Sequence, residues 1–302
     1  MKVAVCLITH NAGHFLRKCI ISVLNQTYKE FRLVIVDDGS MDNTQHIIQD
    51  FGDKRIHYKR NSRQLGIAAS RNECIEQLKD EEYIYFTDAD CCVEPDWIEN
   101  GLAFFEKDRN VICVNGKTIY VCEGYRPHLF EKSHIQTDNW SEAYQTCNIA
   151  YKRIVFQKVR GFDERNFNYF LEDTDFAIRA KTEFPNMKFV STDKVKVIHQ
   201  KVEFTVSGFF SDTRKVLYII RLLKTYGKNN DMIRFAFSGN ILNKNYLLLS
   251  LFPPGIIYYI VKTKKRVSCL RDLLFVFLYV VKSYYYRVLV WKYGIKERVL
   301  IL

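Results

Sequence analysis

The sequence predicts an α/β protein with a mostly parallel sheet flanked by helices, followed by a mainly helical C-terminal region. In the first two hundred residues, short β-branched apolar runs alternate with segments whose apolar residues recur at helical spacing. Alternation of this kind is typical of parallel strands joined by crossover helices. After about residue 205 the composition becomes basic and aromatic, which indicates a second region with a different role.

Strands and helices are expected to alternate from the start of the chain. The expected strands are residues 3–8, 31–36, 55–59 and 83–87, and the expected helices are 15–24, 42–51 and 68–78. Further along, Asn115-Gly116 lies between two apolar runs and predicts a hairpin of strands 111–114 and 117–122. The segment 171–175 (LEDTD), which contains three acids, opens a helix, and a late strand, 194–198, ends directly before His199.

The net charge of +11 is divided unevenly along the chain. From Lys201 onward there are 18 Lys and Arg against 5 Asp and Glu, whereas the first two hundred residues hold 27 against 29. The slightly acidic first two hundred residues, with their paired carboxylates, are poorly suited to binding nucleic acid. The basic, aromatic residues from Lys201 onward suit an anionic membrane surface. We therefore expect an N-terminal domain, residues 1–205, and a basic, aromatic-rich C-terminal helical region, residues 206–302.

The C-terminal region contains no uninterrupted apolar run of the ~20 residues that a single membrane span needs. Residues 246–261 are broken by Pro253-Pro254-Gly255, residues 262–266 are basic, and residues 284–291 mix aromatic and basic side chains. This mixture is typical of helices that lie on a membrane surface. The alternative is a helical subdomain that packs its apolar face on the N-terminal domain.

Cysteine usage and the N-terminus indicate the compartment. Nine cysteines with no Cys-x-x-Cys pair form neither a zinc module nor a disulfide framework, and they suit a reducing environment. The first apolar run, residues 3–8, is too short for a signal peptide. We expect a cytoplasmic protein that is peripheral on the inner face of the plasma membrane.

Three polar clusters directly follow apolar runs: residues 9–11, 37–40 and 88–90. The carboxyl ends of parallel strands meet at one edge of a sheet, where ligands bind, so these clusters are expected to lie together. Asp88 and Asp90 are two positions apart and share one face of an extended backbone. A solvated loop is the ordinary alternative for such a short pattern, and two adjacent carboxylates favour a bound cation.

The N-terminal domain resembles the GT-A glycosyltransferases of family 2, which are inverting enzymes that use nucleotide-diphosphate sugars. Seven pieces carry the resemblance, and they occur in the order typical of the family. They are residues 5–11 (VCLITHN), 24–28 (LNQTY), 36–44 (VDDGSMDNT), 61–72 (NSRQLGIAASRN), 87–90 (TDAD), 161–164 (GFDE) and 172–175 (EDTD). Each piece is weak alone, and together they cover roughly the first two hundred residues.

The resemblance implies roles for individual residues. The implied nucleotide-sugar-binding residues are Thr9, Asn11, Asp38, Gly66, Arg71, Asp88, Asp90 and Glu172. A Mn²⁺ or Mg²⁺ ion would be held by Asp90 and His199 and would stabilise the leaving diphosphate. Asp173, the second acid of the Glu-Asp pair, would be the general base that deprotonates the acceptor hydroxyl. The alternative for these acids is that they complement the N-terminus of a helix.

The implied function is transfer of a sugar, from a UDP-sugar or another nucleotide-diphosphate sugar, to a glycan or lipid-linked glycan in bacterial surface polysaccharide synthesis. Processive members of the family carry a Gln-x-x-Arg-Trp motif, whereas Gln200 is followed here by Lys-Val-Glu-Phe, which favours single additions. Trp140 is a candidate for stacking on a sugar ring. Two other functions stay open at this point: a nucleotidyltransferase and a non-catalytic, membrane-bound sugar-binding protein.

Overall fold

The computed structural model describes residues 2–121, 144–200, 210, 212–227 and 270–299. The chain divides into two compact units, and each is treated by itself. The larger unit contains the described residues up to 200, and the smaller unit contains those from 210 onward. The expectations for Trp140, for residues 246–261 and for the basic run 262–266 lie outside the described residues.

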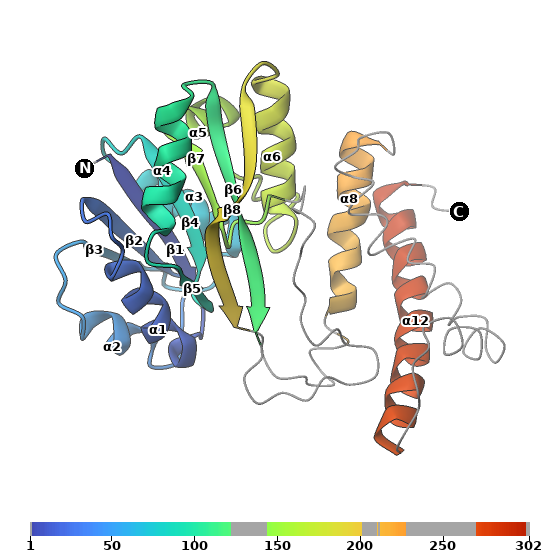
Figure 1. Ribbon diagram of the computed structural model, residues 1–302. Coiled ribbons are helices and arrows are strands. Elements are labelled where there is room, and N and C mark those ends of the chain that lie inside the picture. The colour runs from blue at the N-terminus through green and yellow to red at the C-terminus, as the bar shows by residue number, and fades with distance from the viewer. Residues whose placement is uncertain (1, 122–143, 201–209, 211, 228–269, 300–302) are drawn as a thin grey trace. The chain divides into compact units, whose positions relative to one another are not determined.

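One eight-stranded sheet forms the centre of the larger unit, with the strand order β3-β2-β1-β4-β7-β6-β8-β5 (Figure 1). The strands are β1 (Val3–Thr9), β2 (Phe31–Asp37), β3 (Ile56–Arg60), β4 (Tyr83–Asp88), β5 (Cys91–Val93), β6 (Val111–Val121), β7 (Ile149–Lys152) and β8 (Lys188–Gln200). Strands β1 to β4 pair in parallel, as does β6 with β8, whereas β7 and β5 run antiparallel to their neighbours. The predicted mostly parallel sheet is confirmed.

Helices cover both faces of the sheet. They are α1 (Gly13–Leu24), α2 (Thr44–Gln49), α3 (Ile67–Glu76), α4 (Trp97–Lys107), α5 (Arg153–Val159) and α6 (Glu172–Glu183). Alternate strand residues such as Leu7 and Tyr85 share a buried cluster with apolar residues of α1 and α4. On the opposite face, Phe86 packs against Phe156 of α5, which stacks on Phe176 of α6. Both faces of the central strands are therefore apolar, as a doubly covered sheet requires.

The strand register brings the predicted polar clusters to one edge. Thr9 pairs with Asp37 across β1 and β2, and Ile8 pairs with Asp88 across β1 and β4. The three strands therefore end level, and the residues that follow them lie side by side. The prediction that these clusters share the carboxyl edge of the sheet is confirmed.

The predicted hairpin at Asn115-Gly116 is wrong, because residues 111–121 form one continuous strand, β6. A two-residue turn of this type needs positive φ at both positions, and neither residue is among those with positive φ. Glycine is required at position 116 for a different reason, because a Cβ there would lie 2.4 Å from the Asn148 side chain and from the Val195 carbonyl. A register shift against β8 also follows Gly116, so the glycine marks a bulge and a close approach of the backbone.

The late strand is longer than predicted. β8 extends from Lys188 to Gln200, so His199 lies within the strand and not after it. There it pairs with Cys91 of the short strand β5. This pairing, which the sequence alone does not indicate, fixes the position of His199 beside the acidic loop.

The smaller unit contains a short 3₁₀ helix, η1 (Asp212–Lys215), and two described helices, α8 (Val216–Tyr226) and α12 (Leu270–Glu297) (Figure 1). Val216 and Ile220 of α8 pack against Tyr286 and Val290 of α12. Glu297 accepts hydrogen bonds from Arg221 at 3.0 Å and from Lys224 at 3.2 Å. Within the described residues, no helix has the length and apolar content to cross a membrane.

Candidate active site

Thr9 ends β1 in the middle of the carboxyl edge. Its side chain is buried, and its Oγ1 atom has no hydrogen-bond partner among the described residues. The Oγ1 atom of Thr87, one residue before the end of β4, is in the same situation. Buried hydroxyls without partners are costly, and these two lie on the neighbouring strands β1 and β4, close to the edge where the polar clusters meet.

Asp38 is buried and holds the loop that precedes α3. Its Oδ1 accepts a hydrogen bond from the Leu65 N–H at 2.7 Å, and its Oδ2 accepts one from the Gly66 N–H at 2.9 Å. Asn61 donates a further bond to Oδ1 at 3.3 Å. The Asp38 carboxylate therefore shapes the polar loop 61–66 at the edge of the sheet, whatever else it contacts.

Gly66 has a φ of 108°, which favours glycine. A Cβ here would also lie 2.5 Å from the Asn168 side chain. Asn168 reaches across from the segment before α6 and donates to the Leu65 carbonyl at 2.6 Å. Its backbone carbonyl accepts a hydrogen bond from the Ala68 N–H at 3.0 Å, which satisfies a free donor at the start of α3. Gly66 is therefore a point of close contact between the loop and the segment that leads into α6.

Asn11 is exposed and has a left-handed backbone with a φ of 52°. Its N–H donates to the Ser40 hydroxyl at 2.9 Å, and its Oδ1 accepts a hydrogen bond from the Met41 N–H at 2.8 Å. These bonds tie the loop after β1 to the loop after β2. The left-handed conformation is one that Asn tolerates better than most residues.

Arg71 connects Asp88, the last residue of β4, to Glu172 at the start of α6. Its buried guanidinium donates to Asp88 Oδ1 at 3.0 Å and to Glu172 Oε1. Burial lowers the pKa of Arg71, but the carboxylates of Glu172 and Asp88 outweigh burial and leave its pKa raised. The arginine therefore stays charged and holds together two carboxylates that would otherwise repel each other.

Asp173 lies at the start of α6, next to this cluster. Burial and the neighbouring Glu172 carboxylate raise its pKa from 3.8 to about 7, against the opposing effect of Arg71. The residue before the helix, Leu171, has a left-handed φ of 64°. Such a conformation is uncommon for leucine. It sets the direction in which the chain enters α6, whose first turn contains the acids Glu172, Asp173 and Asp175. A carboxylate that titrates near neutral pH is well matched to proton transfer.

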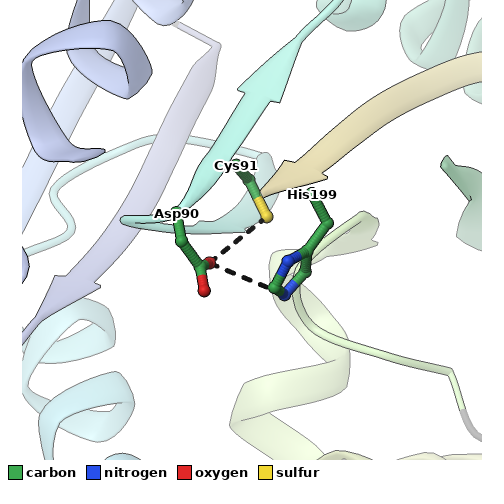
Figure 2. A group of neighbouring side chains, drawn as sticks. All are labelled: Asp90, Cys91 and His199. Carbon is green, nitrogen blue, oxygen red and sulfur yellow. Dashed lines mark hydrogen bonds and ion pairs between the residues drawn. The ribbon is translucent and has the colours of Figure 1, made fainter. Parts of the chain in front are cut away.

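Asp90 and His199 approach each other from the acidic loop and from β8 (Figure 2). Their Oδ1 and Nε2 atoms are 3.6 Å apart. Nδ1 of His199 is 3.0 Å from the Gln200 carbonyl oxygen, and a hydrogen on Nδ1 would leave the lone pair of Nε2 directed toward Asp90. Burial and the charge of Asp88 raise the pKa of Asp90, which His199 partly offsets. One carboxylate and one imidazole held in this way fit a divalent cation.

The structure therefore brings the candidate residues into three groups. Asp88, Arg71, Glu172 and Asp173 form one cluster, Asp90 and His199 form a second, and Thr9, Asn11, Asp38 and Gly66 belong to the loops that end β1 and β2. Sequence reasoning missed Asn168, which ties α3 to the α6 segment, and Cys91, which lies beside Asp90. Neither belongs to the polar clusters 9–11, 37–40 and 88–90 or to the motif residues to which the resemblance implies a role.

Replacing Arg71 with Met is expected to lower the free energy of unfolding by about 3 kcal/mol near pH 8, because two carboxylates lose their buried cation. The loss should be smaller near pH 5, since burial raises the pKa of Glu172 and this carboxyl can then be neutralised by protonation. Urea denaturation at both pH values measures the difference. The matched control is Arg17→Met, which removes an exposed ion pair with Asp50 and should cost less than about 1 kcal/mol. Equal costs for both variants would contradict the role given to Arg71.

The fold, a mostly parallel sheet flanked by helices, is of the GT-A type. Residues 4–178 match the family described as Glycosyl transferase family 2, and the chain belongs to that family. It is therefore a glycosyltransferase, and the resemblance drawn from its motifs is confirmed. The family match contradicts the nucleotidyltransferase alternative.

Two relatives illustrate the family, and one solved structure illustrates the fold. The chain is 29% identical over 177 residues to the glucosyl-dolichyl phosphate glucuronosyltransferase of Haloferax volcanii, a match spanning 54% of this chain and 56% of that protein. It is 27% identical over 214 residues to the UDP-Glc:alpha-D-GlcNAc-diphosphoundecaprenol beta-1,3-glucosyltransferase WfaP of Escherichia coli, a match spanning 68% of this chain and 80% of that protein. The chain thus spans little more than half the length of the Haloferax relative.

The solved structure is the mannosyltransferase PcManGT from Pyrobaculum calidifontis in complex with GDP-Man and Mn²⁺. It aligns with 98% of this chain and 86% of its own, with a TM-score of 0.60 and 15% sequence identity. At that identity the likeness shows the fold alone.

Proposed function

We propose that this protein is an inverting, non-processive glycosyltransferase that moves a sugar from a nucleotide-diphosphate donor to a hydroxyl of a glycan or lipid-linked glycan. The observation that carries the proposal is the Arg71 bridge, which joins Asp88 at the end of β4 to Glu172 at the start of α6. The bridge fixes two sets of residues in one cluster, although about eighty positions separate them in the sequence. One set would handle the leaving group, and the other would activate the acceptor.

In this proposal Asp173 is the general base. Its raised pKa of about 7 places it close to the pH at which a base combines availability with basicity. The carboxylate takes the proton of the acceptor hydroxyl as the oxygen attacks the anomeric carbon. Attack opposite the leaving diphosphate inverts the configuration at that carbon. Arg71 and Glu172 act as positioning residues that hold Asp173 relative to Asp88.

Asp90 and His199 would hold a Mn²⁺ or Mg²⁺ ion, whose chemistry is to neutralise the charge that develops on the leaving diphosphate. Thr9, Asn11, Asp38 and the loop ending at Gly66 would receive the nucleotide. Two observations support this division: the Thr9 hydroxyl at the strand end has no hydrogen-bond partner in the described part of the chain, and Asp38 shapes the adjoining loop. The Mn²⁺ in the PcManGT complex agrees with a cation in this fold.

We propose a UDP-sugar as the donor and a lipid-linked glycan of bacterial surface polysaccharide synthesis as the acceptor. The name of WfaP contains both UDP-Glc and a diphosphoundecaprenol-linked sugar, and the name of the Haloferax relative contains a dolichyl phosphate. GDP-Man in the PcManGT complex makes a GDP-sugar the main competitor. In this proposal residues 1–205 carry the transfer reaction, and residues 206–302 bring the enzyme to the membrane from the cytoplasmic side.

A stripe of exposed apolar side chains on α12 supports the membrane role. It consists of Phe277, Val281, Tyr284, Val288, Trp291 and Ile295, with exposures that reach 63% for Trp291 and 80% for Ile295. The spacing of three and four residues places them on one side of the helix, opposite the side that packs on α8. Large aromatic residues of this kind favour the interface of a bilayer.

The charges near this α12 stripe favour an anionic bilayer over a second copy of the chain. Lys292, Lys296 and Arg298 are exposed close to the stripe, whereas the nearby acid, Glu297, is held by Arg221 and Lys224 of α8. Two such faces would bring like charges together across a dimer interface. Anionic lipid head groups would instead match the cations, at about 1 kcal/mol for each Lys or Arg near the surface.

The double substitution Trp291→Ser with Ile295→Ser is expected to weaken binding to phosphatidylglycerol vesicles at least ~10-fold, because two large apolar side chains no longer enter the interface. Vesicle flotation at several salt concentrations measures the effect. The matched control, Met41→Ser with Tyr169→Ser, removes exposed apolar residues of the larger unit and should float like the wild type. Unchanged flotation of the α12 variant would contradict the proposal. The stripe would then contact protein instead of lipid, either a second copy of the chain or the larger unit.

The proposed function as a whole is tested by donor turnover. Release of free nucleotide from a panel of UDP-, GDP- and dTDP-sugars is measured with Mn²⁺, with and without a lipid-linked acceptor. The expected result is one preferred UDP-sugar whose turnover rises when the acceptor is added. Turnover of a GDP-sugar alone would correct the donor, and no turnover of any nucleotide sugar would overturn the proposal.

A further inference from the structure

A thiol lies beside the proposed metal ligands. The ligand atoms of Asp90, Cys91 and His199 all lie within 4.8 Å of one another (Figure 2). The Cys91 Sγ atom is 3.7 Å from Asp90 Oδ1, and His199 Nε2 is 3.6 Å from the same oxygen. Together these residues offer one sulfur, one oxygen and one nitrogen ligand from two adjacent strands and the loop between β4 and β5.

The sheet explains why the three side chains meet. Cys91 on β5 pairs with His199 on β8, and directly paired residues of an antiparallel ladder point to the same face. Cys91 is fully buried, whereas the side chains of His199 and Asp90 retain 21% and 28% of their exposure. The group is therefore closed on the sulfur side and open to solvent on the side of the carboxylate and the imidazole. Cys92, the next residue along β5, points to the opposite face.

We propose that Cys91 is a third protein ligand, and that the site therefore binds thiophilic divalent cations, Zn²⁺ and Cd²⁺, more tightly than Mn²⁺ or Mg²⁺. The inference rests on the proposed metal role of Asp90 and His199. Sulfur is a soft ligand that zinc and cadmium accept and magnesium does not. On binding, the thiol releases its proton to solvent, and the sulfur donates an electron pair to the cation.

The distances from Asp90 Oδ1 to the other two ligand atoms are close to those around a tetrahedral ion. Tetrahedral zinc bonds of about 2.0–2.1 Å to nitrogen or oxygen and 2.3 Å to sulfur require about 3.3 Å between nitrogen and oxygen and about 3.6 Å between oxygen and sulfur. The observed 3.6 Å and 3.7 Å differ from these values by no more than a few tenths of an ångström. A bound Zn²⁺ or Cd²⁺ would occupy the position of the ion proposed for the leaving diphosphate and would displace it.

The test uses the full chain and Cd²⁺ alone, because a cadmium–thiolate bond gives an ultraviolet charge-transfer band that does not depend on activity. The wild type and Cys92→Ser are expected to develop this band with one equivalent of Cd²⁺. Cys91→Ser should lack it and bind Cd²⁺ at least ~10-fold more weakly, while its affinity for Mn²⁺ changes less than about threefold. A band that is absent from the wild type, or that persists in Cys91→Ser, would overturn the proposal.

A second measurement needs no variant. The electron paramagnetic resonance signal of free Mn²⁺ reports its displacement from the wild-type protein as Cd²⁺ is added. Full displacement near one equivalent is expected, and retention of Mn²⁺ at several equivalents would count against a shared site. Both measurements are independent of turnover, so failure of the proposed sugar transfer and failure of the thiol ligand give different results.

Discussion

Replacing Asp173 with Asn is expected to slow sugar transfer by about 10²- to 10⁴-fold while nucleotide affinity stays within a factor of about three. Asparagine keeps the size of the side chain and can still accept the hydrogen bond from the Thr174 N–H, which is 2.7 Å long in the wild type. It cannot take a proton from an acceptor hydroxyl. Initial rates of nucleotide release and titration calorimetry with UDP separate the chemical step from binding.

The matched control for this substitution is Asp193→Asn, which changes an exposed carboxylate of β8 outside the site. Its transfer rate should equal that of the wild type. Asp173→Asn with full activity would remove Asp173 from the mechanism. Loss of UDP binding together with activity would instead assign Asp173 to the donor.

The pH dependence of transfer follows from the same carboxylate. A base acts in its deprotonated form, and the pKa of Asp173 is raised to about 7 by burial and by Glu172. The rate is therefore expected to rise tenfold per pH unit below about pH 7 and to level off above it. A rate that is constant from about pH 5 to pH 8 would contradict a base with a raised pKa.

The contribution of Asp173 to the free energy of unfolding falls as pH rises, whereas the transfer rate increases. The folded state binds the Asp173 proton more tightly than the unfolded state, whose pKa is near 3.8, so this group destabilises the fold increasingly as pH rises from about 4 to about 7. Asp173→Asn should then raise the free energy of unfolding near pH 8 by about 1–3 kcal/mol, measured by urea denaturation. Near pH 4 the free energies of unfolding of the variant and the wild type should be equal. The gain would also show that the inactive variant is folded.

Removing the divalent cation is expected to lower transfer about 10³-fold, because the leaving diphosphate would have to depart without several kcal/mol of charge stabilisation. Chelation followed by addition of Mn²⁺ should restore the wild-type rate. Asp90→Asn should stay slow at any Mn²⁺ concentration, since it loses the carboxylate that lies 3.6 Å from His199. Asp96→Asn, an exposed acid a few residues later, is the control and should respond to Mn²⁺ like the wild type. Full activity after exhaustive chelation would contradict the metal role.

The sheet and its polar edge could be predicted because they depend on local signals. An apolar run that ends in polar residues marks the carboxyl end of a strand, and the level register of Thr9 with Asp37 follows once the strands are parallel. The start of α6 was equally clear, since three acids precede a helical apolar pattern. These features need no information about distant contacts.

The role of Gly116 and the pairing of His199 with Cys91 could not be predicted from the sequence, because both depend on tertiary contacts. Gly116 serves the close approach of Asn148, whose side chain donates to the Lys117 carbonyl at 2.9 Å and accepts from Trp97 at 2.8 Å. His199 is placed by its pairing with Cys91 across two strands that are about a hundred residues apart in sequence. The Asn-Gly pair usually marks a turn, but here the glycine makes room for a neighbouring side chain. The histidine was expected after a strand, but it lies within one.

Some motif residues support the site from outside it. Gln26 is fully buried, donates to the Glu94 carbonyl at 2.7 Å and accepts from the Ile98 N–H at 3.0 Å, which fixes α1 to the start of α4. Asn72 accepts a hydrogen bond from the Phe162 N–H at 2.8 Å and thereby docks the segment before α6 on α3. A sequence motif alone does not separate such supporting residues from those that would touch a substrate.

The central claim, direct transfer with Asp173 as the base, is tested most directly by the configuration of the product. Proton nuclear magnetic resonance, recorded early in the reaction with an α-linked nucleotide sugar, distinguishes a β-linked from an α-linked product before any free sugar equilibrates. Single displacement opposite the diphosphate predicts the β-linked product. An α-linked product would require a different mechanism and would contradict the account.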